Sequence, residues 1–94
     1  MKLRRDVFQG VADPTRRAIL FLVDSDIMTA GAIARNFGSA RPTISKHLHI
    51  LKECKILLQE QNGRELYYRI NFQKIEEIAD FIDAFHKTKG EIRN

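Results

Sequence analysis

The feature that most constrains the fold of this chain is a two-helix pattern within residues 29–54, broken once by turn-forming residues. The break, residues 36–40, contains Gly38 among small or polar side chains, which end a helix and permit a sharp change of direction. A second helix is predicted from about Arg41 to Cys54. At about 100° per residue, one arc of this helix is mainly apolar and carries Ile44, His47, Leu48, Ile50, Leu51 and Cys54. This arrangement predicts a helix-turn-helix whose second helix rests with one face on a small core.

The opposite arc of that second helix is polar, and consists of Arg41, Pro42, Ser45, Lys46, His49, Lys52 and Glu53. Polar groups near the start of such a helix reach base edges when the helix enters the major groove of DNA. We therefore expect Arg41 and Ser45 to contact bases or nearby phosphates. Lys46 and His49 are expected to contact phosphates or groove edges. The alternative for such an arc is plain exposure to solvent.

The charge of the chain is unevenly distributed. Its formal net charge of +4 lies in residues 1–54, with nine Lys or Arg against five Asp or Glu, whereas residues 55–94 hold seven of each. A basic half that coincides with the helix-turn-helix suits a polyanionic partner. No apolar run approaches the roughly 18 residues of a membrane span, and no signal-peptide segment follows the start. A cytoplasmic protein without membrane insertion is therefore expected.

The first third of the chain predicts two further helices. Residues 4–11 show the apolar spacing of a short helix. Asp13 is the expected cap of a second helix over residues 14–24, which begins with proline. Arg16 and Arg17 stand in the first turns of that helix, where arginine opposes the helix dipole. They are either solvated, or they contact a phosphate or an acidic neighbour.

An Asn-Gly pair at residues 62–63 separates two apolar-rich runs, residues 56–61 and residues 64–70. This pair is the strongest short hairpin signal, because both central residues of a type I′ turn need positive φ. Arg64 lies at the expected tip, where it reaches an adjacent minor groove or phosphate, or remains a solvated turn residue. A further short strand is expected at residues 27–28. In the second run, the side chains expected to face inward are Leu66, Tyr68 and Ile70.

Asn71 is the expected cap of a last helix over residues 72–87. The apolar face of this helix is wider than a domain of this size buries easily. We therefore predict a homodimer in which this face meets a second copy, with the first helix alongside. The alternative is that the face packs into the core of its own chain. The predicted interface residues are Val7, Phe8, Val11, Ile75, Ile78, Ile82 and Phe85.

Together these elements predict a mainly α fold with a small β-hairpin. The expected architecture is a winged helix-turn-helix with about five helices and a two- to three-stranded antiparallel wing. Residues 1–94 form a single DNA-binding domain in this interpretation, with dimerisation helices at its N- and C-terminal ends.

The same residues resemble the ArsR/SmtB family of bacterial winged-helix repressors. The resemblance spans nearly the whole chain, and rests on Ala12–Leu20 (ADPTRRAIL), Thr29-Ala30 with Ile33-Ala34, Arg41–Leu48 (RPTISKHL), Leu51-Lys52-Glu53, and Gly63-Arg64 with Tyr68. It implies a homodimer that binds an inverted-repeat operator in double-stranded DNA and represses transcription, often of its own operon. It also implies DNA contacts from the start of the second helix and from the wing tip, namely Arg41, Pro42, Thr43, Ser45, Lys46 and Arg64.

Two positions depart from the pattern of that family. Ala40 stands where many members have a serine cap before the second helix, so Ser39 would have to serve as the cap. Lys55 stands where many members have glycine just after that helix. Either Lys55 adopts a left-handed conformation, or the helix ends in a different way.

The sequence lacks the residue sets that metal-responsive members of the family carry. Cys54 is the single cysteine, which excludes a cysteine cluster, and residues 29–37 contain no Cys, His, Asp or Glu. The last helix offers Asp83 and His86 without a second histidine to follow. We therefore expect no metal site and no cofactor, as in the metal-independent members of the family. An unidentified protein or small molecule would then act as inducer.

Two other classes of function were weighed. A winged helix also serves as a protein-interaction module without DNA binding, because fold alone does not fix function. An enzyme is not expected, since the chain has no glycine-rich phosphate loop and no Ser, His and acid at spacings that suggest a catalytic triad.

Overall fold

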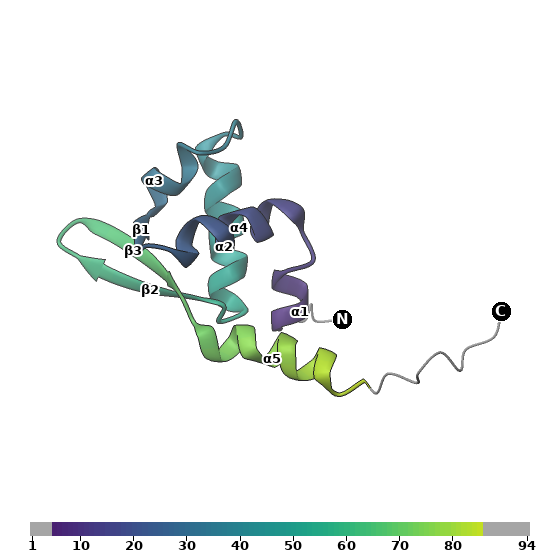
Figure 1. The fold of residues 1–94 in the computed structure, drawn as a ribbon. Coiled ribbons are helices and arrows are strands. Elements are labelled where there is room, and N and C mark those ends of the chain that lie inside the picture. The colour runs from purple at the N-terminus through teal and green to yellow at the C-terminus, as the bar shows by residue number, and fades with distance from the viewer. Residues whose placement is uncertain (1–4, 86–94) are drawn as a thin grey trace.

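A computed structural model describes residues 5–85 of the chain. Its elements follow the order α1 (Val7–Gly10), α2 (Pro14–Asp24), β1 (Met28–Thr29), α3 (Ala30–Ala34), α4 (Arg41–Glu53), β2 (Leu57–Asn62), β3 (Glu65–Ile70) and α5 (Phe72–Asp83). Helices α2, α3 and α4 form the body of the molecule, the β2–β3 hairpin projects from one side of it, and α5 lies beneath α1 (Figure 1). Five helices and a three-stranded sheet in the described part confirm the predicted architecture.

Helix starts follow the capping residues in the sequence. The Asp13 carboxylate accepts a hydrogen bond from the backbone N–H of Arg16 at 3.0 Å, which confirms the predicted start of α2. The Thr29 hydroxyl accepts from the N–H of Ala32 at 3.1 Å at the start of α3. Helix α1 is shorter than expected, because Asp6 occupies its cap position and accepts from the N–H of Gln9.

The core lies between α2, α3, α4 and the base of the hairpin. Its buried side chains are Val7, Ile19, Leu20, Val23, Ile33, Ile44, Leu48, Leu51, Cys54, Ile56, Leu57, Tyr68 and Ile70. The predicted inner arc of α4 is therefore the face that packs inward. Val7 was expected at a dimer interface, but it is only 2% exposed and belongs to this core. The Val7 side chain packs into the core of its own chain, and it thereby holds α1 against the body of the molecule.

The end of α4 resolves the alternatives for Lys55. Lys55 adopts a left-handed conformation with φ of 63°. The N–H of Ile56 donates to the carbonyl of Leu51, and the N–H of Lys55 donates to that of Lys52, at 3.0 and 2.9 Å. This pair of bonds is a Schellman motif, which turns the chain sharply out of the helix. Asn71 secures the turn from outside, since its side-chain amide donates to the Lys55 carbonyl at 3.0 Å.

The hairpin pairs β2 with β3 in an antiparallel register, and β1 adds a third strand on the far side of β3. Asn62 pairs with Glu65, so the two central turn residues are Gly63 and Arg64 rather than Asn62 and Gly63. Gly63 has φ of 66°, and Arg64 is not among the positive-φ residues. Glycine alone at the first central position indicates a type II′ turn, not the predicted type I′.

Two of the three strand residues expected to face inward do so. Tyr68 and Ile70 are buried, whereas Leu66 is 40% exposed. Leu66 pairs with Gln61 near the turn of the hairpin, and it does not belong to the core. Tyr68 accepts a hydrogen bond from the side chain of Gln59 across the strands, at 2.9 Å.

Helix α5 is the most weakly buried long helix of the described chain. None of its residues is fully buried, although Ile75 and Ile78 pack against the edge of the core. Asn71 occupies the predicted cap position, but its side chain forms no capping bond because it binds the Lys55 carbonyl instead. The helix ends at Asp83, earlier than expected, and residues 86–87 of the predicted helix lie outside the described residues.

Lys55→Gly is expected to raise the free energy of unfolding by about 0.5–1 kcal/mol, since glycine adopts a left-handed backbone without the steric cost of a Cβ atom. Urea unfolding followed by circular dichroism measures the change. Lys52→Gly, inside the last turn of α4, is the matched control and should lower stability by about 1 kcal/mol. Shifts of the same sign in both variants would contradict strain at Lys55.

Candidate nucleic-acid interface

The outer face of α4 carries the residues that the sequence analysis selected. Burial of the inner face orients the helix, so that polar side chains point away from the core. Every predicted DNA-contact residue is exposed: Arg41, Pro42, Thr43, Ser45, Lys46, His49 and Arg64. Exposure is the first requirement for contact with an external ligand.

The fold brings the start of α4 close to the hairpin tip. A surface hollow of about 200 Å³ lies between them and α3, and is lined by Ala30, Gly31, Arg41, Arg64, Glu65 and Leu66. Arg41 and Arg64 are distant in sequence, but the fold brings both to this hollow. Two basic residues and one acidic residue, Glu65, therefore contribute to its lining.

Arg35 is a third cation of this region, and the sequence analysis did not select it. A methyl group added at Gly31 would lie 3.6 Å from Nη1 of Arg41 and 3.8 Å from Nη1 of Arg35. Both distances are ordinary van der Waals contacts, so two guanidinium groups lie near the same point of α3. The sequence does hold a signal for Arg35, because residues 31 and 35 are four apart and therefore lie on the same face of a helix.

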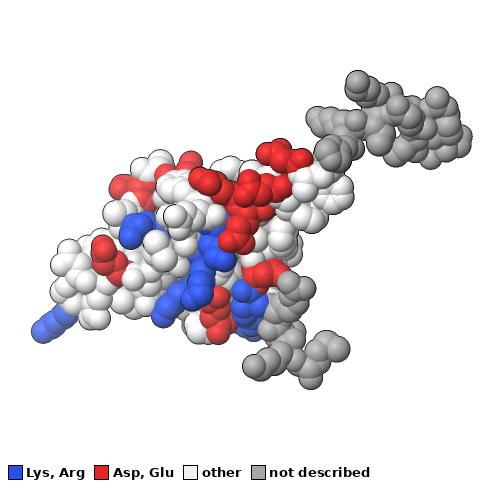
Figure 2. All heavy atoms as spheres, turned by 90° about the horizontal axis from the view of Figure 1, so that it is seen from below, with Lys and Arg blue, Asp and Glu red and all other residues white. Residues whose placement is uncertain are grey.

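These cations are not neutralised by the protein. Within residues 5–85, no carboxylate forms an ion pair with Arg35, Arg41, Lys46 or Arg64. Acidic side chains gather instead along α5, as the view from below shows (Figure 2), where the exposed acids are Glu76, Glu77, Asp80 and Asp83. A Lys or Arg side chain also projects from the hairpin end in that view (Figure 2). The acidic residues of α5 are therefore not the neighbours of Arg41 and Arg64, although Lys74 on the same helix pairs with Glu77 at 2.9 Å.

His49 differs from the other predicted contacts, because it already has a partner. Its Nε2 lies 3.5 Å from Oε1 of Glu53, one turn further along α4. The same Glu53 oxygen accepts a hydrogen bond from Nε of Arg5 at 2.9 Å. This bond from Arg5, with the nearby charge of His49, holds the pKa of Glu53 below its ordinary value. His49 therefore belongs to a small ionic cluster at the C-terminal end of the helix.

The start of α4 has no side-chain cap. Ala40 occupies the cap position, and Ser39 does not replace it, so no side chain accepts from the first turn. The carbonyl of Ala40 accepts from the N–H groups of Thr43 and Ile44 at 3.0 and 3.3 Å. Pro42 has no N–H, which reduces the number of unpaired donors. The positive end of the helix dipole thus remains open to an external anion.

The side chains of Arg16 and Arg17 bind backbone carbonyls rather than carboxylates, although Arg17 is also exposed to solvent. Nε of Arg16 donates to the carbonyl of Gly10 at 2.9 Å, and Nη2 donates to that of Gln9 at 3.1 Å. Nη1 of Arg17 donates to the carbonyl of Val11 at 2.8 Å. Both arginines therefore satisfy carbonyl groups at the end of α1, a role that spacing in the sequence does not reveal.

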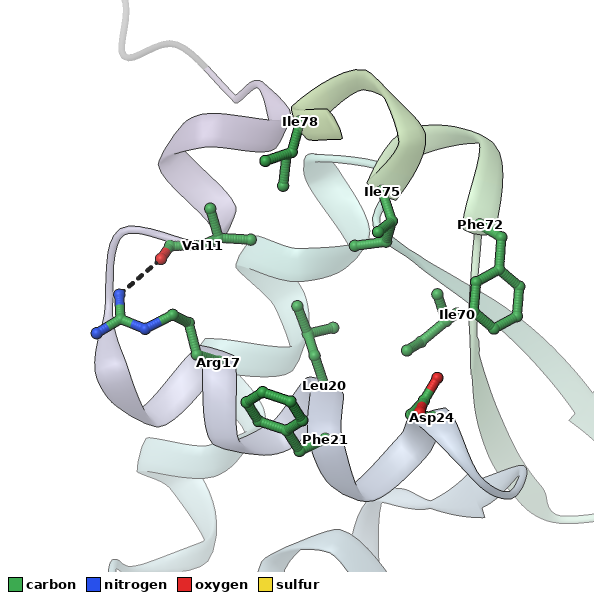
Figure 3. Close-up of a pocket in the computed structure, with 9 residues that line it drawn as sticks. All are labelled: Val11, Arg17, Leu20, Phe21, Asp24, Ile70, Phe72, Ile75 and Ile78. Carbon is green, nitrogen blue, oxygen red and sulfur yellow. Dashed lines mark hydrogen bonds between the residues drawn. The ribbon is translucent and has the colours of Figure 1, made fainter. Parts of the chain in front are cut away.

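Apolar side chains cluster at the opposite end of the molecule. Phe81 makes edge-to-face ring contacts with Phe8 and Phe85, with centroids 4.8 and 5.0 Å apart. Ile82 and Phe85 are 61% and 64% exposed. A groove of about 390 Å³ continues from this face between α2 and α5 (Figure 3), lined by Val11, Arg17, Leu20, Phe21, Asp24, Ile70, Phe72, Ile75 and Ile78. Such a surface is unusual for an isolated chain.

Metal-binding and membrane-spanning features were also sought in the described residues. No group of three or more His, Cys, Asp or Glu side chains is arranged there to hold a metal ion. His86, which the sequence analysis considered with Asp83, lies outside those residues. Cys54 is buried, which raises the pKa of its thiol. No helix between residues 5 and 85 is long and apolar enough to cross a membrane.

An exposed recognition helix, a three-stranded wing and unpaired cations between them define a winged helix-turn-helix regulator. Residues 13–57 match the family model described as "Bacterial regulatory protein, arsR family". The chain is 40% identical over 80 residues to the transcriptional repressor SdpR of Bacillus subtilis, covering 85% of this chain and 89% of that protein. The chain therefore belongs to the ArsR family of transcriptional regulators.

Two further comparisons agree with that membership. An uncharacterised helix-turn-helix transcriptional regulator of Methanocaldococcus jannaschii is 33% identical, over 83% of this chain and 89% of its own length. A crystal structure described as a "possible transcriptional regulator for arsenical resistance" superposes with a TM-score of 0.78 and 32% identity, covering 85% of this chain and 83% of that one. Relatives and structural neighbours alike are regulators of transcription.

Ala40→Ser is expected to raise the free energy of unfolding by about 1 kcal/mol, because a serine hydroxyl at the cap position accepts from the first turn of α4. The urea midpoint of the variant measures this gain. Ser39→Ala is the control and should change stability by less than about 0.5 kcal/mol. If Ser39→Ala destabilised the protein by as much as Ala40→Ser stabilises it, Ser39 would be the functional cap.

Proposed function

We propose that this chain is a sequence-specific repressor that binds double-stranded DNA as a homodimer, with each copy acting as one DNA-binding domain. The operator is an inverted repeat, and one such site lies upstream of the repressor's own coding sequence. In this proposal α4 enters the major groove, and the β2–β3 hairpin contacts the adjacent backbone or minor groove. Release depends on an inducer that acts away from α4.

The observation that carries the proposal is the hollow shared by Arg41 and Arg64. A duplex that lies against the start of α4 also meets the hairpin tip, so that one polyanion would neutralise both guanidinium groups. Arg35, whose guanidinium lies near Gly31 of the hollow, and Lys46, which is exposed on α4, also form no ion pair with a carboxylate among residues 5–85. Proteins that neutralise phosphates with such cations gain affinity by releasing counterions.

The distribution of acidic and apolar residues supports a particular orientation of each copy on the DNA. The acidic residues of α5 favour a position away from the phosphates. The apolar residues of the α1–α5 face, Phe8, Val11, Ile75, Ile78, Ile82 and Phe85, form the interface with the second copy. Two-fold symmetry then directs both recognition helices toward one side of the dimer.

The DNA contacts are tested by fluorescence anisotropy with the duplex upstream of the gene. Arg41→Ala and Arg64→Ala should each weaken binding about tenfold, equivalent to about 1.4 kcal/mol. Lys46→Ala should weaken binding to operator and unrelated DNA alike, with a salt slope lower by about 1. Glu65→Gln, which removes a negative charge from the same hollow, should tighten binding. Binding indifferent to salt and to all four changes would support a protein-interaction module instead.

The dimer is tested by sedimentation equilibrium at several protein concentrations. Ile82→Ser should shift the mass toward a single chain, because Ile82 is 61% exposed in one copy and serine places a polar group in the proposed interface. Ile27→Ser is the control, since Ile27 is 50% exposed but lies outside the proposed interface. A monomeric parent chain, or dissociation caused equally by both variants, would contradict this arrangement.

A further inference from the structure

The Arg16 side chain joins three elements of the fold at one point. Its Nε and Nη2 donate to the carbonyls of Gly10 and Gln9 at the end of α1. Its Nη1 lies 3.3 Å from Nδ1 of His47, on the inner side of α4. Arg16 itself belongs to α2, whose cap Asp13 also binds the Arg16 backbone N–H. One guanidinium group therefore connects α1 and α2 to the recognition helix.

The chemistry of the contact determines the form of His47. A guanidinium group has only donors, so Nδ1 of His47 accepts and the ring proton resides on Nε2. The carboxylate of Asp13 is 3.9 Å from Nδ1, beyond hydrogen-bond distance. The His47 side chain is only 18% exposed. The largely enclosed His47 ring thus places Nδ1 of α4 within hydrogen-bond distance of Arg16.

The end of α1 depends on this contact. Gln9 Oε1 is buried and has no hydrogen-bond partner among the described residues, and an unsatisfied buried acceptor is unfavourable. Arg16 donates to the Gly10 carbonyl, and it shares the Gln9 carbonyl with the backbone N–H of Ala12, which donates to it at 3.2 Å. At its other side α1 meets α5 through the rings of Phe8 and Phe81. Helix α1 is therefore held between the apolar α1–α5 face and the Arg16–His47 contact.

We propose that Arg16 is a positioning residue for DNA binding, which transmits the position of α1 to α4 through His47. This inference rests on the proposed function, and it identifies how that function is regulated. An inducer that displaces α1 at the α1–α5 face removes the Gln9 and Gly10 carbonyls from Arg16, and so loosens the orientation of α4. The switch then acts without contact between inducer and DNA-binding residues.

The test is a double-mutant cycle with binding to the upstream duplex as the readout. Arg16→Lys keeps the charge but replaces the planar guanidinium fork by a single ammonium nitrogen, which cannot reach acceptors on both α1 and α4 with the same geometry, and His47→Leu removes the acceptor. Each should weaken binding about tenfold, and the double variant should be no weaker than about tenfold because both changes break one link. His47→Gln, whose side-chain oxygen accepts, should restore binding to within about threefold of the parent. Arg17→Lys is the matched control and should bind as the parent does, because the Arg17 side chain donates to the Val11 carbonyl, whereas the contact with His47 belongs to Arg16.

Two spectroscopic measurements separate positioning from simple destabilisation. Ring ¹⁵N shifts of His47 should report the Nε2-protonated form in the parent and a mixture in Arg16→Lys. Amide hydrogen exchange should increase at α1 and at the middle of α4 in Arg16→Lys, but not in Arg17→Lys. Parental affinity in Arg16→Lys and His47→Leu, or additive losses of about a hundredfold, would overturn the inference. If the parent binds no DNA, the proposed function fails, and unchanged exchange in α4 would overturn the coupling independently.

Discussion

The burial of one face of α4 is the constraint on which the site depends. Ile44, Leu48 and Leu51 occupy the centre of the core, and together they fix the rotation of the helix about its own axis. Burying each such side chain contributes about 1.5–3 kcal/mol, so a rotated helix would lose most of the stability of a small domain. The outer face, with Arg41 and Lys46, is consequently held in one orientation, as a recognition surface requires.

The exit from α4 converts that fixed helix into a two-part site. The left-handed Lys55 closes the helix in a Schellman motif, and Asn71 ties the same turn to the start of α5. The hairpin therefore leaves α4 at a defined angle, and its tip carries Arg64 to the hollow that Arg41 also lines. The strained backbone of Lys55 is thus stabilised by three hydrogen bonds. Two of them join backbone N–H groups to carbonyls of α4, and the third is donated by the side-chain amide of Asn71.

The sequence predicted features that depend on local chemistry. Capping by Asp13, the inner arc of α4 and the existence of the hairpin follow from spacing and side-chain type, and the structure agrees with each. The turn type was wrong because the strand register, a non-local property, assigned Asn62 to β2. The role of Arg16 was missed for a similar reason, since its acceptors lie on α1 and α4, and only the assembled core brings them together.

In the proposed complex, two copies of α4 and its wing bind one duplex symmetrically, and no metal ion controls the binding. Selection of bound sequences from random duplex DNA, with and without added zinc, tests both statements. We expect enrichment of a single inverted repeat in both conditions, with half-site centres about one helical turn, or about 34–36 Å, apart or a multiple of that distance. Enriched sequences without two-fold symmetry, or no enrichment at all, would contradict symmetric binding, and a repeat that appears or disappears with zinc would contradict metal-independent binding.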